Sequence, residues 1–136
     1  MMPRPLHPPG WPRPRGHANG MAAKGTLVVT GGQSGRTPDG RFAAEDLVGQ
    51  FHQALKNVTA VLATANAWPQ HVVRLTCHVT DIQAYRDNLE SIGAAYRDVM
   101  GDHYPAMALA QVVSLLEPEA LVEIEATAVV PDELPS

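Results

Sequence analysis

The hydrophobic residues of this 136-residue chain repeat with two different periods, and each period predicts a different kind of element. Spacings of three and four run through residues 43–65 and again from about 80 to 100, which is typical of helices that bury one face. Other segments are β-branched or alternate between apolar and polar residues, which is typical of strands with one buried face. The predicted strands are residues 26–30, 72–80, about 107–114 and 121–130.

Turn and capping residues set the predicted ends of these elements. Thr37-Pro-Asp-Gly40 indicates a turn before the first helix, because proline presets φ and glycine can adopt a positive φ. Trp68-Pro69 ends that helix, since proline removes an amide donor and restricts the residue before it. Thr80-Asp-Ile-Gln83 has the form of a capping box and predicts the start of the second helix. Gly101 and Pro105 predict its end.

The order of these elements predicts one α+β domain. Two helices on one face of a mixed sheet give a two-layer architecture, and 136 residues suit a single core. The beginning of the chain differs, because six of the 12 prolines fall within residues 1–14 and exclude a helix there. We therefore expect residues 1–16 to form an extended proline-rich segment and residues 17–136 to form the domain.

Composition and charge exclude several classes of protein. The apolar fraction is 45%, but the unbroken apolar runs are far shorter than the roughly 20 residues that cross a bilayer, so we expect no membrane partner. Residues 17–136 keep 7 of the 10 basic side chains and all 14 acidic ones, a formal charge of −7 that argues against a nucleic-acid partner. The single cysteine, Cys77, cannot form an internal disulfide, and no signal peptide is evident, so we expect a cytoplasmic protein.

Neither a metal site nor a cofactor site is predicted. The six histidines are scattered, without the spacing of a ligand set beside carboxylates. The glycines between Gly31 and Gly35 lack the lysine and the directly following helix that a phosphate-binding loop needs. The chemistry is therefore expected to come from side chains and backbone amides alone.

Several short motifs occur in a recognisable order and spacing. They are Leu27-Val-Val-Thr-Gly-Gly-Gln33, Asn57, Arg74-Leu-Thr-Cys-His-Val-Thr-Asp81, Tyr96, Tyr104-Pro-Ala106 and Val122-Glu-Ile-Glu-Ala126. Together they resemble the RidA family, also called YjgF/YER057c/UK114, over about residues 16–130. The resemblance implies a chorismate-mutase-like α+β fold and a homotrimer with three clefts between subunits. It also implies, for archetypal members, hydrolysis of 2-aminoacrylate-type imines to 2-keto acids and ammonia.

The apolar pattern agrees with the trimer that the resemblance implies. Two alternating sets exceed what two helices and solvent are expected to cover, so we expect three sheets to close into a barrel-like core. These sets are Met107, Leu109 and Val113, and Val122, Ile124, Ala126 and Ala128.

The chain departs from the archetypal pattern at the substrate site. In archetypal members an arginine that binds the substrate carboxylate follows the Pro-Ala pair, and here that residue is Met107. Methionine has no donor, so a carboxylate there loses an interaction of about 1.5 to 3 kcal/mol. An archetypal tyrosine aligns with His17, an asparagine with Gly93, and a serine or threonine with Gly31. These departures predict a substrate other than the usual imino acid.

The candidate site combines what the resemblance implies with what the residues can do. Glu123 matches the glutamate that positions water and is the predicted general base, while Glu125 is a weaker candidate. His17 is the predicted proton donor to the leaving amine. Backbone amides at a strand end can bind a carbonyl or carboxylate group. The predicted substrate-binding residues are Gly31, Gly32, Gln33, His103, Tyr104 and Met107.

Some alternatives stay open at this point. Arg36 or Arg41 replaces the missing arginine if their loop folds over the cleft; otherwise both are exposed turn residues. The leading prediction for the function is a divergent enamine/imine deaminase that releases ammonia. A non-catalytic small-molecule-binding or regulatory trimer is the alternative. Ribonuclease activity, which has been attached to relatives, disagrees with the acidic body of the chain.

Overall fold

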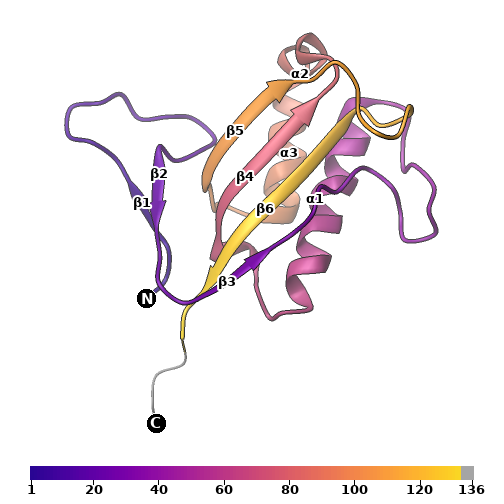
Figure 1. Cartoon of the computed structure of the whole chain (residues 1–136). Coiled ribbons are helices and arrows are strands. Elements are labelled where there is room, and N and C mark those ends of the chain that lie inside the picture. The colour runs from indigo at the N-terminus through magenta and orange to yellow at the C-terminus, as the bar shows by residue number, and fades with distance from the viewer. Residues whose placement is uncertain (133–136) are drawn as a thin grey trace.

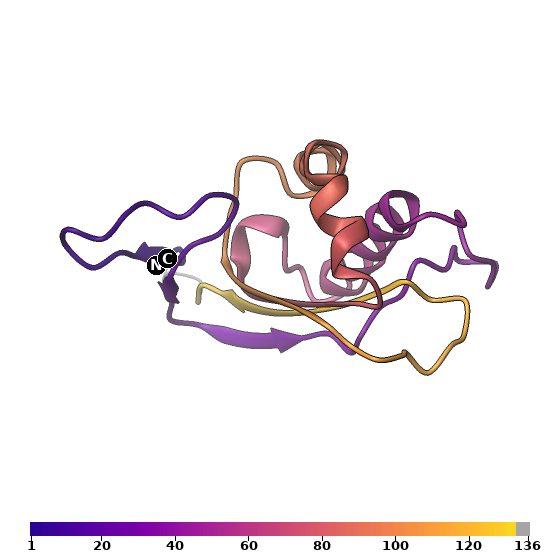
Figure 2. The ribbon, with the colours of Figure 1, turned by 90° about the horizontal axis from the view of Figure 1, so that it is seen from above.

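The computed structural model describes residues 1–132 and has two layers, a mixed four-stranded sheet and helices on one of its faces (Figures 1 and 2). This architecture confirms the predicted α+β class. The elements, in chain order, are β1 (Arg4–Leu6), β2 (Gly20–Ala22), β3 (Thr26–Val29), α1 (Leu47–Ala63), η1 (Pro69–His71), β4 (Val72–Val79), α2 (Ile82–Asp87), α3 (Leu89–Met100), β5 (Ala106–Gln111) and β6 (Val122–Val130).

The strands of the main sheet follow the order β3-β6-β4-β5. β6 pairs antiparallel with both β3 and β4, whereas β4 and β5 are parallel. A parallel pair needs a crossover connection, and α2 and α3 provide it. Strands β3 and β5 form the two edges of the sheet, and the outer side of β5 is bridged at Ala106 by Ala18 of the N-terminal segment.

The core lies between the sheet and the helices. α1 contributes its stripe of fully buried Leu55, Val58 and Leu62. β6 contributes Val122, Ile124, Ala126 and Ala128, each no more than 3% exposed. The helices therefore cover this apolar set within one subunit, which corrects the expectation that the set is left for contact between subunits. Val113, which was placed in the other set, is wholly exposed, because β5 ends at Gln111 rather than at about residue 114.

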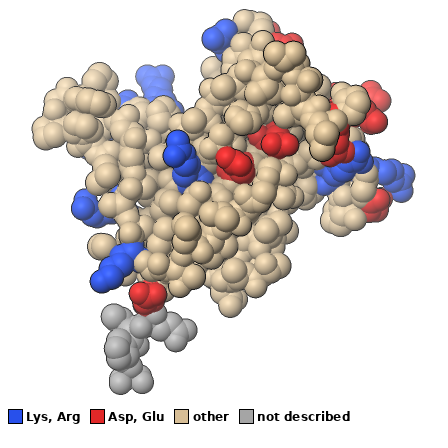
Figure 3. All heavy atoms as spheres, viewed as in Figure 1, with Lys and Arg blue, Asp and Glu red and all other residues tan. Residues whose placement is uncertain are grey.

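The opposite face of the sheet is open in the single chain and faces the viewer in Figure 1. Its apolar part lies on β3, where Leu27 and Val29 are 65% and 62% exposed. Charged side chains are sparse over this face, with a small acidic group near its middle (Figure 3). Glu123 and Glu125 are the acidic residues that β6 turns toward it.

Helix boundaries differ from the predictions where side chains bond to the backbone. α1 begins at Leu47 rather than near residue 43, because the Asp46 carboxylate accepts a bond from the Gly49 amide. The second predicted helix begins after Asp81 rather than Thr80, since the Asp81 carboxylate accepts bonds from the first amides. It is also interrupted at Asn88, whose backbone leaves helical geometry, so that α2 and α3 are separate.

The proline-rich start forms an arm beside the two layers (Figure 2). It is extended, as expected, and β1 pairs antiparallel with β2 in a separate two-stranded ribbon. This pairing joins residues on both sides of the boundary predicted at residue 16. The arm is attached to the body where the Ala18 amide donates to the Pro105 carbonyl at 2.9 Å. Within residues 1–132, no helix combines the length and apolarity required to cross a membrane.

The buried amide of Gln50 connects α1 to the segment that leads into β6. Gln50 is 2% exposed, and its Nε2 donates to the carbonyls of Ala44 and Glu119, both at 3.1 Å. Its Oε1 accepts from the Leu121 amide at 2.8 Å. One side chain thus satisfies three backbone groups of two loops, which fixes the entry to the strand that carries Glu123.

We predict that Gln50→Leu lowers the free energy of unfolding by roughly 2 kcal/mol or more, because it leaves buried backbone groups without partners. Gln53→Leu, on the same helix but only half-buried, is the matched control and is expected to change stability by much less. Urea denaturation of both variants measures the difference. Equal stability of the two variants would contradict the connecting role of Gln50.

Candidate functional site

The predicted site residues fall into two groups on opposite faces of the sheet. Side chains alternate along a strand, so Glu123 points away from the buried Val122 and Ile124 and toward the open face. Met107 pairs with the buried Leu75 and therefore lies on the helix-covered face. Glu123 and Met107 thus do not share one cavity within a single subunit.

The first group consists of Gly31, Gly32 and Gln33 beside Glu123. Gln33 and Ile124 exchange backbone bonds, N to O, of 2.8 and 2.9 Å, which holds the segment after β3 against β6. A Cβ built on Gly32 would lie 2.4 Å from Oε1 of Glu123, so this carboxylate rests directly on the glycine backbone. On the other side of β6, His78 of β4 is the register partner of Glu123 on the same face. His78 lies within the motif of residues 74–81 but was not among the predicted site residues.

A shallow hollow of about 400 Å³ continues from Gly32 and Gln33 toward α1. Asn57 of α1 shapes its loop, because the Asn57 amide donates to the Ser34 carbonyl at 2.9 Å and the Arg36 carbonyl at 2.6 Å. Asn57 was one of the residues that carried the resemblance, and this role is structural.

The two arginines considered as replacements are both paired in this loop region. Arg36 forms a salt bridge with Glu117 and lies 4.4 Å over the ring of Phe42. The bond from Glu117 raises the pKa of Arg36, and the same contact lowers the pKa of Glu117. Arg41 pairs with Asp39 at 3.2 Å. Neither arginine lines the hollow that contains Met107.

The second group lines a hollow of about 770 Å³ between the start of the chain, α3 and the covered face of the sheet. It includes His17, Tyr104 and Met107, together with Gly93 of α3. Three of these residues, His17, Gly93 and Met107, are among the four positions at which the chain departs from the archetypal pattern; the fourth, Gly31, lies in the first group. The structure therefore brings together substitutions that are far apart in the sequence.

The lining of this hollow is apolar and aromatic with a cationic side. Phe51, Leu89, Ile92 and Leu109 contribute apolar surface, and the tyrosines of the lining are Tyr85, Tyr96 and Tyr104. Burial raises the pKa of Tyr85 to about 12 and also raises that of Tyr96, so both phenols are neutral donors at neutral pH. Arg15 and Arg97 supply the positive charge, and no Asp or Glu of residues 1–132 lines the hollow.

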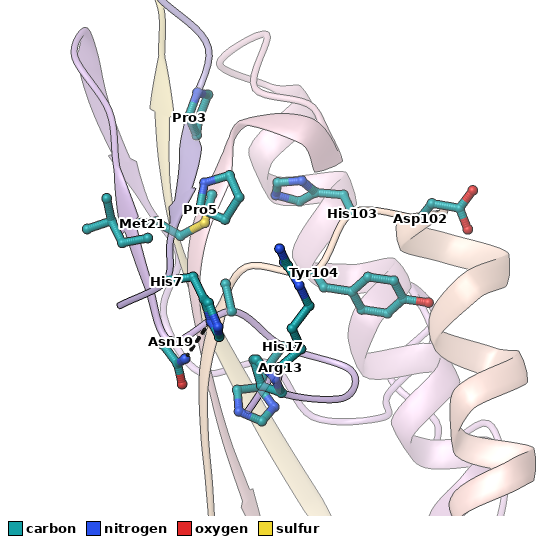
Figure 4. A pocket seen from close by; sticks show the side chains of 13 residues that line it. Pro3, Pro5, His7, Arg13, His17, Asn19, Met21, Asp102, His103 and Tyr104 are labelled. Atoms are coloured by element: carbon teal, nitrogen blue, oxygen red, sulfur yellow. Dashed lines mark hydrogen bonds between the residues drawn. The ribbon is translucent and has the colours of Figure 1, made fainter. Parts of the chain in front are cut away.

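His17 and Tyr104 also border a smaller hollow of about 320 Å³ beneath the arm (Figure 4). There the His7 ring donates to the Trp11 carbonyl at 2.8 Å and accepts from Asn19 at 3.2 Å, which fixes the turn of the arm. His103 lines this hollow rather than the larger one, and its Nε2 donates to the Val72 carbonyl at 2.7 Å. His103 therefore holds the loop that positions Tyr104.

Tyr104 is fixed by stacking. Its ring lies 5.3 Å from that of Tyr96, nearly parallel at 12°, and the Tyr96 hydroxyl donates to the His103 carbonyl at 2.6 Å. Cys77 lies in the core, where burial raises the pKa of its thiol to about 12, so it is not a nucleophile. Among residues 1–132, no cluster of three His, Cys, Asp or Glu side chains forms a candidate metal site.

Comparison with known proteins defines the family. Residues 12–130 match the family model described as Endoribonuclease L-PSP. The 2-iminobutanoate/2-iminopropanoate deaminase of Salmonella typhimurium is 31% identical over 108 residues, which cover 77% of this chain and 80% of that protein. The chain therefore belongs to the RidA, or YjgF/YER057c/UK114, family.

Solved structures agree with this assignment. A Rid-family protein of unknown function from Yersinia pestis, YyfB, is similar with a TM-score of 0.84 and 30% identity, covering 96% of this chain and all of that one. A member of the YjgF/YER057c/UK114 family from Mycobacterium tuberculosis has a TM-score of 0.65 and 31% identity, covering 85% of this chain and 88% of that one.

We predict that Gly32→Ala displaces the Glu123 carboxylate without unfolding the protein, because the new methyl group meets a flexible side chain. Gly31→Ala is the matched control, since nothing lies within 4 Å of a Cβ built there. Crystal structures of both variants report the position of Glu123, and thermal melting reports stability. An unmoved Glu123 in Gly32→Ala would contradict the contact.

Proposed function

We propose that this protein is a hydrolytic enamine/imine deaminase that releases ammonia from an imine other than the 2-aminoacrylate type. Its similarity to proteins named 2-iminobutanoate/2-iminopropanoate deaminase supports the reaction class. The observation that carries the proposal is the Glu123 carboxylate, which lies against Gly32 on the open face of the sheet. A carboxylate that can act as a general base thereby lies beside a glycine, where no side chain blocks the approach of a substrate.

The proposed reaction uses water and two side chains. Glu123 takes a proton from water as the water oxygen attacks the carbon of the protonated imine, which gives a neutral carbinolamine. His17 then gives a proton to the nitrogen, and the C–N bond breaks with its electron pair leaving on ammonia. The hydroxyl proton of the carbinolamine returns to His17 as the oxygen becomes a carbonyl, and Glu123 releases its proton to solvent water. The Gly32 amide is the candidate for stabilising the oxygen during this step, because the Gln33 amide already donates to the Ile124 carbonyl.

We propose further that the site is completed between subunits of a homotrimer. Glu123 and Met107 lie on opposite faces of one sheet, so His17 and Glu123 of the same chain do not meet in one cavity. A neighbouring copy whose open face covers the Met107 hollow would supply the missing carboxylate. The exposed Leu27 and Val29 on the open face support such an association.

Light scattering is expected to give three times the 14.6 kDa of the chain. Leu27→Glu places a charge on the open face and is expected to lower the mass toward that of the monomer. Ala94→Glu, which places the same charge on the exposed side of α3, is the control and should leave the mass unchanged. A monomeric wild-type protein would contradict the shared site.

We predict that Glu123→Gln lowers imine hydrolysis by about 100-fold or more, because the amide cannot accept the proton of water. Glu125→Gln, on the same strand and face, is the control and is expected to keep most of the activity. Imines are generated in the assay from amino acids by an amino-acid oxidase, and their decay is followed by trapping with semicarbazide.

Two results would contradict the proposed function. Unchanged turnover in Glu123→Gln would remove this carboxylate from the mechanism. If wild-type protein bound keto acids but accelerated the hydrolysis of no imine, the alternative of a non-catalytic small-molecule-binding trimer would replace the deaminase. The apolar, acid-free lining of the Met107 hollow is the observation that favours this alternative.

A further inference from the structure

We propose that Arg97 of α3 anchors the anionic group of the substrate in the hollow beside Met107, and that the substrate is a 2-imino acid with a bulky apolar side chain. This inference deepens the proposed function and rests on it for the reaction. The anchor is thereby a helix residue that was not among the predicted site residues.

The contact between Gly93 and Arg97 shows why the guanidinium reaches the hollow. Arg97 follows Gly93 by four residues, so the two lie on the same side of α3. A Cβ built on Gly93 would lie 3.2 Å from one terminal nitrogen of Arg97 and 4.0 Å from the other. The guanidinium therefore lies across the glycine, and an asparagine at this position would compete for the space. Arg97 can therefore take this position because residue 93 has no side chain.

The charge of Arg97 is available to a ligand. Within residues 1–132, the salt bridges are Arg36–Glu117, Arg41–Asp39 and His52–Asp98, and none involves Arg97 or Arg15. Arg15 lines the same hollow from the start of the chain. Two guanidiniums and no carboxylate in the lining give a cavity that attracts anions, and a guanidinium can bind a carboxylate through two parallel bonds.

The rest of the lining selects the other part of the substrate. Phe51, Leu89 and Ile92 provide apolar surface, and the Tyr96–Tyr104 pair provides a rigid aromatic one. Met107 adds a flexible thioether where an arginine is expected from the resemblance. In the single subunit the hollow has a volume of about 770 Å³, so an aromatic or long aliphatic side chain can lie along this apolar surface beneath the covering copy.

Binding of 2-oxo-3-phenylpropanoate, the keto acid formed from the imine of phenylalanine, tests the anchor directly. Calorimetry is expected to show binding to wild-type protein that weakens as salt rises, and a loss of about tenfold or more in affinity for Arg97→Met. Arg97→Lys keeps the charge without the two-pronged geometry and should be intermediate. Arg86→Met, on α2 outside the hollow, is the control and should bind like wild type.

A neutral probe separates the anchor from the apolar surface. 1-Phenylpropan-2-one has the same aromatic body without the carboxylate, so its binding should be weaker and unaffected by Arg97→Met. Equal affinity of wild type and Arg97→Met for the keto acid would overturn the inference, as would equal binding of the acid and the neutral ketone to wild type.

The two proposals fail in different ways. Loss of keto-acid binding in Arg97→Met together with no acceleration of imine hydrolysis by wild type would support the anchor and contradict the deaminase. Hydrolysis of the phenylalanine imine with the same kcat/KM in wild type and Arg97→Met would support the deaminase and contradict the anchor.

Discussion

The alternation of side chains across the sheet is the constraint on which the arrangement of this site depends. On β6 it places Val122 and Ile124 in the core and Glu123 on the open face. On β5 it places Met107 with the core residues, because Met107 pairs with the buried Leu75. A shift of one residue in either strand would exchange the faces, so the hydrophobic core fixes which side of the sheet each candidate group occupies. The division of the site into two halves is therefore a consequence of packing.

Because of this division, a single subunit does not hold all the proposed catalytic groups in one cavity. The half on the open face has the carboxylate of Glu123 and the backbone of Gly32. The half on the covered face has the hollow, the imidazole of His17 and the cationic side chains of Arg15 and Arg97. Each half lacks what the other contains, and association of subunits is the simplest way to combine them. In that arrangement, stability of the assembly and formation of the site depend on the same contacts.

The sequence predicted the parts of the fold that follow from periodicity. The stripe of Leu55, Val58 and Leu62 and the alternation along β6 determined helices, strands and the buried faces, since burial of apolar side chains dominates both. Helix ends were less accurate, because the Asp46 and Asp81 caps depend on local bonds rather than on period. The pairing of β1 with β2 could not be predicted, because neither segment has a periodic pattern of hydrophobic residues.

The candidate site was predictable only where a motif marked it. The resemblance pointed to His17, Gly93 and Met107 as departures, and the structure places all three around one hollow. No motif included Arg97, and an arginine on the exposed side of a helix is common. Its proposed role depends on the neighbouring Gly93, which has no side chain to occupy the same space. The signal that could have identified Arg97 is its spacing of four residues from Gly93, which places both on one side of the helix. This spacing indicates a site only if the glycine is taken to leave room for the guanidinium.

Gly93, Arg97 and Met107 also show how specificity can change while the fold is kept. None of the three is among the fully buried core residues, so substitutions there have small effects on the packing that defines the sheet and helices. An arginine at residue 107 would extend into the hollow from β5 of the sheet, whereas Arg97 extends into it from α3. With the cation on α3 instead of on β5, the surface of the sheet stays apolar and can contact a larger substrate side chain. The position of one charge relative to the sheet thus determines both where an anion binds and how much apolar substrate fits beside it.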